Sequence, residues 1–158
     1  WSTAAKFYKF CQDNSFENML ILNNNFYEYG DWAICGTRGW TLPQNGNAED
    51  EKIYKRELIR MELSLSSARK LGGKKLVVMT HYPPLAENGG ETPMSRLLNT
   101  YQVDDVVYGH LHGASLRGAV TGKYGCVQYH CVSCDGLKFR MYALPGGGEN
   151  TENGAENQ

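Results

Sequence analysis

Two histidines lie two residues apart in a glycine-flanked segment, Tyr108–Gly113, that follows an apolar run over 103–107. In an extended segment, side chains at i and i+2 point the same way from origins roughly 6.6 Å apart. Imidazole is a good ligand for Zn, Fe, Mn or Ni. His110 and His112 are therefore typical of a site for one ion, or for two ions about 3.5–4 Å apart with one histidine each. The alternative is that they are hydrogen-bonded turn residues, because most histidines bind no metal.

Another of the four histidines, His81, has a similar setting. His81 follows a strand-like run over 75–80 and precedes Tyr82-Pro83-Pro84. The two prolines fix φ and favour extended geometry in the residues before them, which would hold an imidazole steady. Ligands in α/β proteins bind at the carboxyl ends of strands, so this histidine and the pair form one candidate site. Alternatively, His81 is a strand-end residue before a rigid turn.

The five cysteines suggest a weaker candidate, because three of them lie near His130. Steps of four residues along a strand span roughly 13 Å, too far for one tetrahedral ion to bind Cys126, His130 and Cys134. Cys131 and Cys134 leave a redox or zinc protein as an alternative if a turn brings them together. The odd cysteine count argues against a disulfide framework, so we expect a reducing, cytoplasmic compartment.

Composition is that of one ordinary globular domain, with 158 residues, 41% hydrophobic and 21% charged. The net charge of −1 predicts no bulk attraction to nucleic acid, and no apolar run is long enough to span a bilayer. We therefore expect neither a membrane nor a nucleic-acid partner. Residues 1–144 are expected to fold, whereas 145–158, rich in Gly, Asn and Glu, are expected to be a disordered tail.

Periodicity predicts the elements of an α/β protein. Helices are expected over 2–14, 48–71 and 92–101. Strands are expected over 19–22, 26–29, 32–35, 75–80 and 103–108, the second and third forming a hairpin and 75–80 buried on both faces. Alternating residues then predict an antiparallel meander over 116–120, 124–133 and 137–144. Acidic residues are interpreted as strand-entry or turn positions: Asp104, Asp105 and Asp135.

These residues resemble a known family. The motifs Thr80-His81-Tyr82-Pro83-Pro84 and Gly109-His110-Leu111-His112-Gly113 are similar to the last two motifs of the calcineurin-like metallophosphoesterases. The strings over 34–40, 52–57 and 132–137 resemble a bacterial subgroup of predicted phosphohydrolases. The resemblance implies part of a four-layer α/β/β/α sandwich with two divalent metal ions at strand ends. It implies that His81 and His110 bind one ion and His112 the other, the ions being Mn, Fe, Zn or Ni.

The same resemblance implies an incomplete site. The family has three earlier motifs that supply most ligands of one ion, a bridging aspartate and an asparagine, and none of them occurs in this chain. We therefore expect the chain to be the C-terminal part of the domain, with an N-terminal half of the same domain as its missing partner. The expected activity is two-metal hydrolysis of phosphate mono- or diesters, with little or none from the isolated chain.

Two residues are candidates for binding a phosphorylated small-molecule or nucleotide substrate. Arg38 follows a predicted strand among small neighbours, and a guanidinium binds phosphate in a bidentate manner. The alternative for Arg38 is a structural role, bonded to loop carbonyls. Tyr82 is expected to line the pocket, whereas Trp40 more often packs in a core. The alternative function is a non-catalytic or truncated phosphoesterase-like binding module.

Overall fold

The computed structural model describes residues 3–43 and 47–145. Its centre is a six-stranded sheet in the order β1-β2-β3-β4-β6-β5. The strands are β1 (Phe26–Tyr29), β2 (Trp32–Gly36), β3 (Lys75–Thr80), β4 (Asp105–Tyr108), β5 (Gly122–Tyr124) and β6 (Val127–Cys131). Strands β2, β3, β4 and β6 run parallel to one another, and the outer strands β1 and β5 pair antiparallel with β2 and β6. The α/β class and the predicted hairpin are confirmed.

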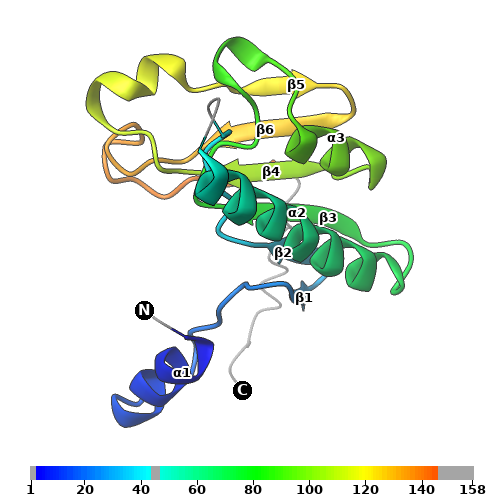
Figure 1. Cartoon of the computed structure of the whole chain (residues 1–158). Coiled ribbons are helices and arrows are strands. Elements are labelled where there is room, and N and C mark those ends of the chain that lie inside the picture. The colour runs from blue at the N-terminus through cyan, green and yellow to red at the C-terminus, as the bar shows by residue number, and fades with distance from the viewer. Residues whose placement is uncertain (1–2, 44–46, 146–158) are drawn as a thin grey trace, which may run out of the picture.

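Three α-helices, α1 (Ala4–Asp13), α2 (Ala48–Arg69) and α3 (Pro93–Thr100), agree closely with the predicted ranges. The side chain of Asn47 accepts from the backbone N–H of Asp50 to begin α2. Thr92 and Ser95 form a reciprocal capping box at the start of α3, with Pro93 in its first turn. Both α2 and α3 lie on the same face of the sheet (Figure 1). Short 3₁₀ helices occupy Glu87–Gly89 and Gly113–Gly118.

The main core lies between this helical layer and the sheet. Met61, Leu65, Leu76, Val78 and Leu98 are all 0% exposed. Complete burial of side chains of this size contributes roughly 1.5–3 kcal/mol each before the cost of ordering the chain. The core therefore fixes β2, β3 and β4 against α2, and with them the loops that follow these strands.

The opposite face of the sheet is only partly covered. Val77 is buried, but Met79, two residues along the same strand, is 48% exposed, so the prediction that β3 is buried on both faces is wrong at its end. The segment after β6 runs across part of this face, where the Tyr142 hydroxyl lies 2.7 Å from His130 Nδ1. A cavity of about 370 Å³ remains between this segment and the sheet.

Two strand predictions are wrong. Residues 19–22 form no strand, because Asn25 Nδ2 and the Tyr27 hydroxyl both donate to the carbonyl of Ile21, and no neighbouring strand pairs with them. The meander is reduced to the β5–β6 hairpin, since 113–118 are a 3₁₀ helix and 137–144 contain no strand. Strand β6 instead runs parallel to β4, which alternation in the sequence cannot reveal.

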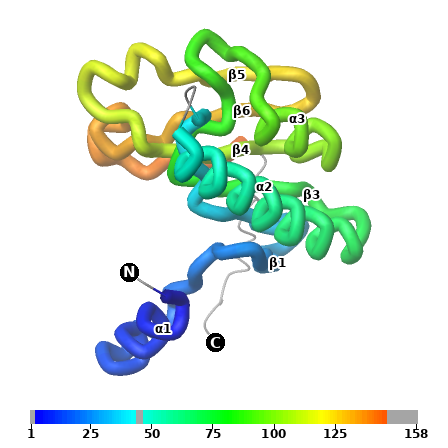
Figure 2. The backbone as a smooth tube through the Cα atoms, viewed as in Figure 1, coloured from blue at the N-terminus to red at the C-terminus, as the bar shows by residue number. Residues whose placement is uncertain are grey.

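Helix α1 lies apart from the other two helices, beyond the β1 edge (Figure 2). The Tyr8 and Tyr27 hydroxyls, 3.0 Å apart, connect it to β1. Among the described residues no helix combines the length and apolar character needed to cross a membrane. The predicted tail from residue 145 falls outside the described residues except for Pro145.

Candidate metal and phosphate site

Polar side chains follow all four parallel strands where these strands have their carboxyl ends. This end of the sheet is called the histidine edge. Arg38 follows β2, His81 follows β3, His110 and His112 follow β4, and Asp135 follows β6. Because parallel strands end at the same edge, residues far apart in the sequence meet there. The structure thus brings the three predicted histidines together and adds a carboxylate.

His110 occupies a strained turn. Its φ is +71°, and the Leu111 N–H donates to the Gly109 carbonyl at 2.9 Å, which together describe a γ-turn of the rare positive-φ kind. His112, by contrast, has an extended φ of −132°. The expectation of an extended segment with both imidazoles side by side is therefore wrong. The turn separates the two imidazoles, which take different partners.

His110 pairs with His81. Its Nδ1 lies 3.1 Å from His81 Nε2, and the ring centroids are 4.9 Å apart. The His81 backbone is fixed because its N–H donates to the carbonyl of Arg38 at 3.0 Å. Partial burial of the ring, and then the nearby His110, His112 and Arg38, lower the pKa of His81. The neutral form, which is the form that binds metal, is thereby favoured at this position.

His112 pairs with Asp135. Its Nδ1 lies 2.9 Å from Asp135 Oδ1, and the Gly113 N–H donates to Oδ2 at 2.8 Å. The hydrogen bond from Gly113, together with that from His112, lowers the pKa of Asp135. An ionised carboxylate only accepts hydrogen bonds, so the neutral form of His112 carries its proton on Nδ1 and its lone pair on Nε2. Ser115 Oγ contacts both the N–H and the carbonyl of His112, at 2.8 and 2.7 Å, and holds its backbone.

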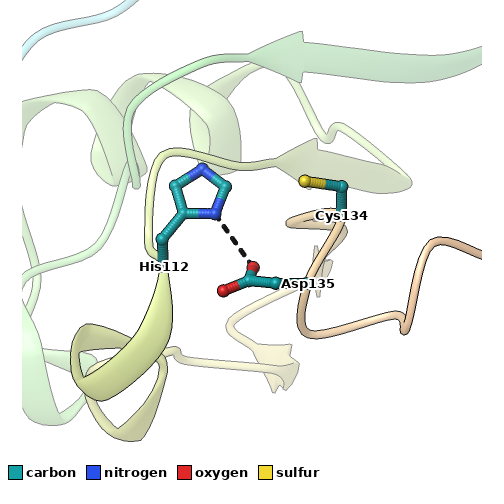
Figure 3. A group of neighbouring side chains, drawn as sticks. All are labelled: His112, Cys134 and Asp135. Atoms are coloured by element: carbon teal, nitrogen blue, oxygen red, sulfur yellow. Dashed lines mark hydrogen bonds and ion pairs between the residues drawn. The ribbon is translucent and has the colours of Figure 1, made fainter.

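Sequence reasoning missed the role of Asp135. The residue does lie in a turn, as predicted, but the turn sits at the histidine edge of the sheet. Its thiol neighbour Cys134 lies there too: the donor atoms of His112, Cys134 and Asp135 are all within 4.8 Å of one another (Figure 3). Recognition of β6 as a parallel strand would have predicted this position, because its carboxyl end then meets that of β4.

Arg38 and Tyr82 stand beside the histidine pair. The Arg38 guanidinium lies 4.4 Å from the centroid of the Trp40 ring, in a cation–π contact. The Tyr82 ring is 4.3 Å from the His110 ring and 5.1 Å from that of Trp40. Arg38 is exposed, and within the described ranges its guanidinium makes no hydrogen bond to a loop carbonyl. The structural alternative for Arg38 is therefore not observed, and its N–H groups are available to an anion.

Helix α2 holds the loop that carries Arg38. Glu57 is 0% exposed, and its carboxylate accepts from Thr37 Oγ1 at 2.5 Å and from Arg60 Nη1 at 2.7 Å. A buried carboxylate with both oxygens paired is costly to disturb, so it fixes Thr37 next to Arg38. Gly36 is required at the end of β2, because a Cβ there would collide with the carbonyl of Met79.

The alternative cysteine site is dispersed in the structure. Cys126 contacts Asn99, with Sγ 3.3 Å from Oδ1, whereas Cys134 lies near His112. His130 is buried, with its Nε2 2.7 Å from Asp105 Oδ1. Asp105 is thus the buried partner of a histidine and not a surface strand-entry residue, which corrects the sequence interpretation.

The residues at the strand ends fit a metal ion in part. Two nitrogens bound to one tetrahedral zinc at about 2.05 Å lie about 3.3 Å apart. The 3.1 Å separation of His81 Nε2 and His110 Nδ1 is close to that value. His112 Nε2, oriented by Asp135, offers a separate nitrogen. Within residues 3–43 and 47–145, this edge brings together three imidazoles, one thiol and one carboxylate, which is fewer ligands than two ions need.

Parallel strands with imidazoles and an arginine at their carboxyl ends have the arrangement of an α/β protein whose ligand site lies at its strand ends. The family model for calcineurin-like phosphoesterases, Metallophos, matches residues 4–114. The chain therefore belongs to the calcineurin-like phosphoesterase family. The matched region contains all three candidate ligand histidines but ends before Cys134 and Asp135. No curated protein and no solved structure matches the chain at a significant level.

Proposed function

We propose that this chain contributes the histidine side of a two-metal phosphoesterase site that hydrolyses phosphate mono- or diesters. The observation that carries the proposal is the placement of His81, His110 and His112 at the shared ends of β3 and β4 in a member of this family. Bound divalent ions of this class supply an activated water and neutralise phosphate charge. His81 and His110 would hold one ion and His112 the other, with Asp135 keeping His112 Nε2 available.

Arg38 and a neighbouring hollow support a small phosphorylated substrate. The exposed guanidinium follows β2, beside β3, and its charge contributes to the lowered pKa of His81, which supports a role for Arg38 in binding phosphate oxygens. A hollow of about 570 Å³ adjoins His110, with Pro83, Leu85 and Leu111 among its walls. A volume of this size fits the organic part of a small phosphoester or nucleotide. We therefore propose that Arg38 binds the phosphoryl group and that Tyr82 borders it.

The test is metal-dependent binding of inorganic phosphate to the full chain, measured by calorimetry with zinc or manganese present. We expect phosphate to bind only with metal, and about tenfold more weakly to Arg38→Ala. Arg96→Ala is the matched control, because Arg96 is exposed on α3 and pairs with Glu91. Equal phosphate affinity for both variants would contradict the role of Arg38, and absence of metal binding would contradict the function.

The number of ligands indicates that the chain by itself has little catalytic activity. Because three imidazoles and one oriented carboxylate leave two ions under-coordinated, we propose that the chain by itself hydrolyses an aryl phosphate little or not at all with Mn²⁺. The alternative, a phosphoesterase-like binding module, shares this expectation. Turnover well above that of a His110→Ala control would refute this proposal and establish the chain as a complete catalyst.

A further inference from the structure

Cys134 lies at the histidine edge of the sheet and outside the region matched by the family model. The residue is exposed, so an ion from solvent can reach its sulfur. Figure 3 shows its Sγ on the same side as the imidazole of His112 and the carboxylate of Asp135. Nitrogen, sulfur and oxygen donors from these three residues lie within 4.8 Å of one another. Such a mixed group has the composition of a metal site.

The Cys134 thiol differs in its surroundings from the thiols of Cys35, Cys126 and Cys131, whereas the fifth cysteine, Cys11, is buried. Cys35 Sγ donates to the Ser64 carbonyl at 3.9 Å, Cys126 Sγ is paired with Asn99, and Cys131 Sγ lies 3.7 Å from Ser133 Oγ. Across the described ranges, the Cys134 sulfur has no hydrogen-bond partner. Its backbone is nevertheless fixed, because its carbonyl accepts from the Phe139 N–H at 2.7 Å. The backbone of Cys134 is thus fixed, while its sulfur makes no hydrogen bond within the described residues.

Asp135 already takes part in three hydrogen bonds. Oδ1 contacts His112 Nδ1 and accepts from the Gly136 N–H, and Oδ2 accepts from the Gly113 N–H. A carboxylate in this arrangement orients the imidazole, which is the usual role of a carboxylate beside a metal-binding histidine. The donors that remain free in this group are His112 Nε2 and Cys134 Sγ.

We propose that Cys134 supplies a thiolate ligand to the ion held by His112, so that this subsite is a mixed nitrogen–sulfur site. The proposal rests on the proposed metal function of His112 and names a ligand that the family match does not include. On binding, the thiol loses its proton to solvent and the sulfur donates a lone pair to the ion. Thiolate ligands favour zinc and cobalt over manganese and magnesium, so this subsite prefers the softer ions.

Cobalt(II) is the probe, because a cobalt–thiolate bond produces an intense near-ultraviolet charge-transfer band in addition to the weak visible bands of any bound cobalt. The full chain is titrated with cobalt alone. We expect the charge-transfer band in the wild-type chain and in Cys126→Ser, and its loss in Cys134→Ser. Cys126 is the matched control, since it too is exposed but lies by Asn99, away from the histidines. The visible bands should persist in Cys134→Ser, with cobalt affinity at the His112 subsite reduced at least tenfold.

A wild-type chain that shows visible cobalt bands without the charge-transfer band would overturn the role of Cys134 and leave the metal function standing. Retention of the band in Cys134→Ser would overturn it equally, and so would loss of the band in Cys126→Ser. No cobalt signal of either kind would refute both proposals. Circular dichroism of each variant checks that the fold is retained.

Discussion

The two halves of the site hold their imidazoles in different ways. His81 and His110 come from two strands and contact each other directly, with nitrogens 3.1 Å apart. His112 is held instead by the carboxylate of Asp135, in the turn after β6, and by Ser115, which contacts the His112 backbone. Only Leu111 separates His110 from His112, and the γ-turn centred on His110 directs the two side chains to different partners. These neighbours in sequence therefore have different partners, which is the basis for assigning them to different proposed subsites.

The first test of this difference between the two halves is to remove one histidine at a time. His110→Ala should abolish one binding event for zinc and leave the other, because His81 keeps no nitrogen partner. His112→Ala should abolish the opposite event. We expect each loss to exceed about 100-fold in affinity, since removal of a ligand costs more than removal of an outer partner. Calorimetric titration of zinc measures both events.

His130→Ala is the control for these variants, since His130 is buried and pairs with Asp105, the first residue of β4, and not with the other histidines. Its removal should leave both zinc-binding events unchanged in any molecules that fold. If His110→Ala and His112→Ala remove the same event, the histidines form one subsite and the division is wrong.

Asp135→Asn tests the second half alone. The amide keeps the size of the carboxylate, but it carries no charge and can donate a hydrogen bond to Nδ1, which favours the wrong tautomer of His112. We expect zinc affinity at the His112 subsite to fall about 10–100-fold, with the His81–His110 subsite unchanged. Nitrogen-15 NMR of the metal-free chain should show His112 protonated on Nδ1 in the wild type and a mixture of tautomers in the variant.

A uniform loss of affinity at both subsites would show that Asp135 supports the whole edge and not His112 in particular. Asp104→Asn is the matched control, because Asp104 Oδ2 accepts from the Leu76 N–H at the start of the strands, far from their carboxyl ends.

Backbone strain gives a third and smaller test. A non-glycine residue at φ +71° costs of order 1 kcal/mol, which glycine avoids. His110→Gly should therefore be about 1 kcal/mol more stable to unfolding than His110→Ala, although both lose the ligand. At position 112 the φ of −132° suits any residue, so His112→Gly should be no more stable than His112→Ala. Urea denaturation of the four metal-free variants measures the difference, and equal stabilities at position 110 would show that its turn stores no strain.

The sequence was enough to predict the half of the site that depends on local patterns. Apolar runs ending at His81 and at Gly109 predict strand ends, and parallel strands bring such ends together. Arg38 was found in the same way, since it follows the hairpin. Periodicity likewise predicted α2 and α3 to within two residues of their observed ends, because caps and acidic first turns fix those ends locally.

The other half depends on a long-range choice. Residues 127–131 pair with β4 in parallel and with β5 in antiparallel fashion, and nothing in their own alternation distinguishes the two arrangements. Interpretation of the segment as a meander placed Asp135 at a distant hairpin. The γ-turn at His110 was also unpredictable, because its positive φ falls on a histidine and not on the preceding Gly109.

The smallest expected effect distinguishes His81 within its own pair. Partial burial, then His110, His112 and Arg38, lower its pKa below the ordinary value of about 6.5. The folded chain therefore prefers neutral His81, and this contribution to stability is present above about pH 6.5 and is lost as the pH falls from there towards the lower folded pKa.

NMR titration of the His81 ring in the metal-free chain should show a midpoint below that of a histidine in a model peptide. His110→Ala should raise this midpoint more than Arg38→Ala, because His110 makes the larger contribution. A midpoint at or above the peptide value would mean that the His81 ring is fully solvated, and that the close His81–His110 contact does not persist without metal.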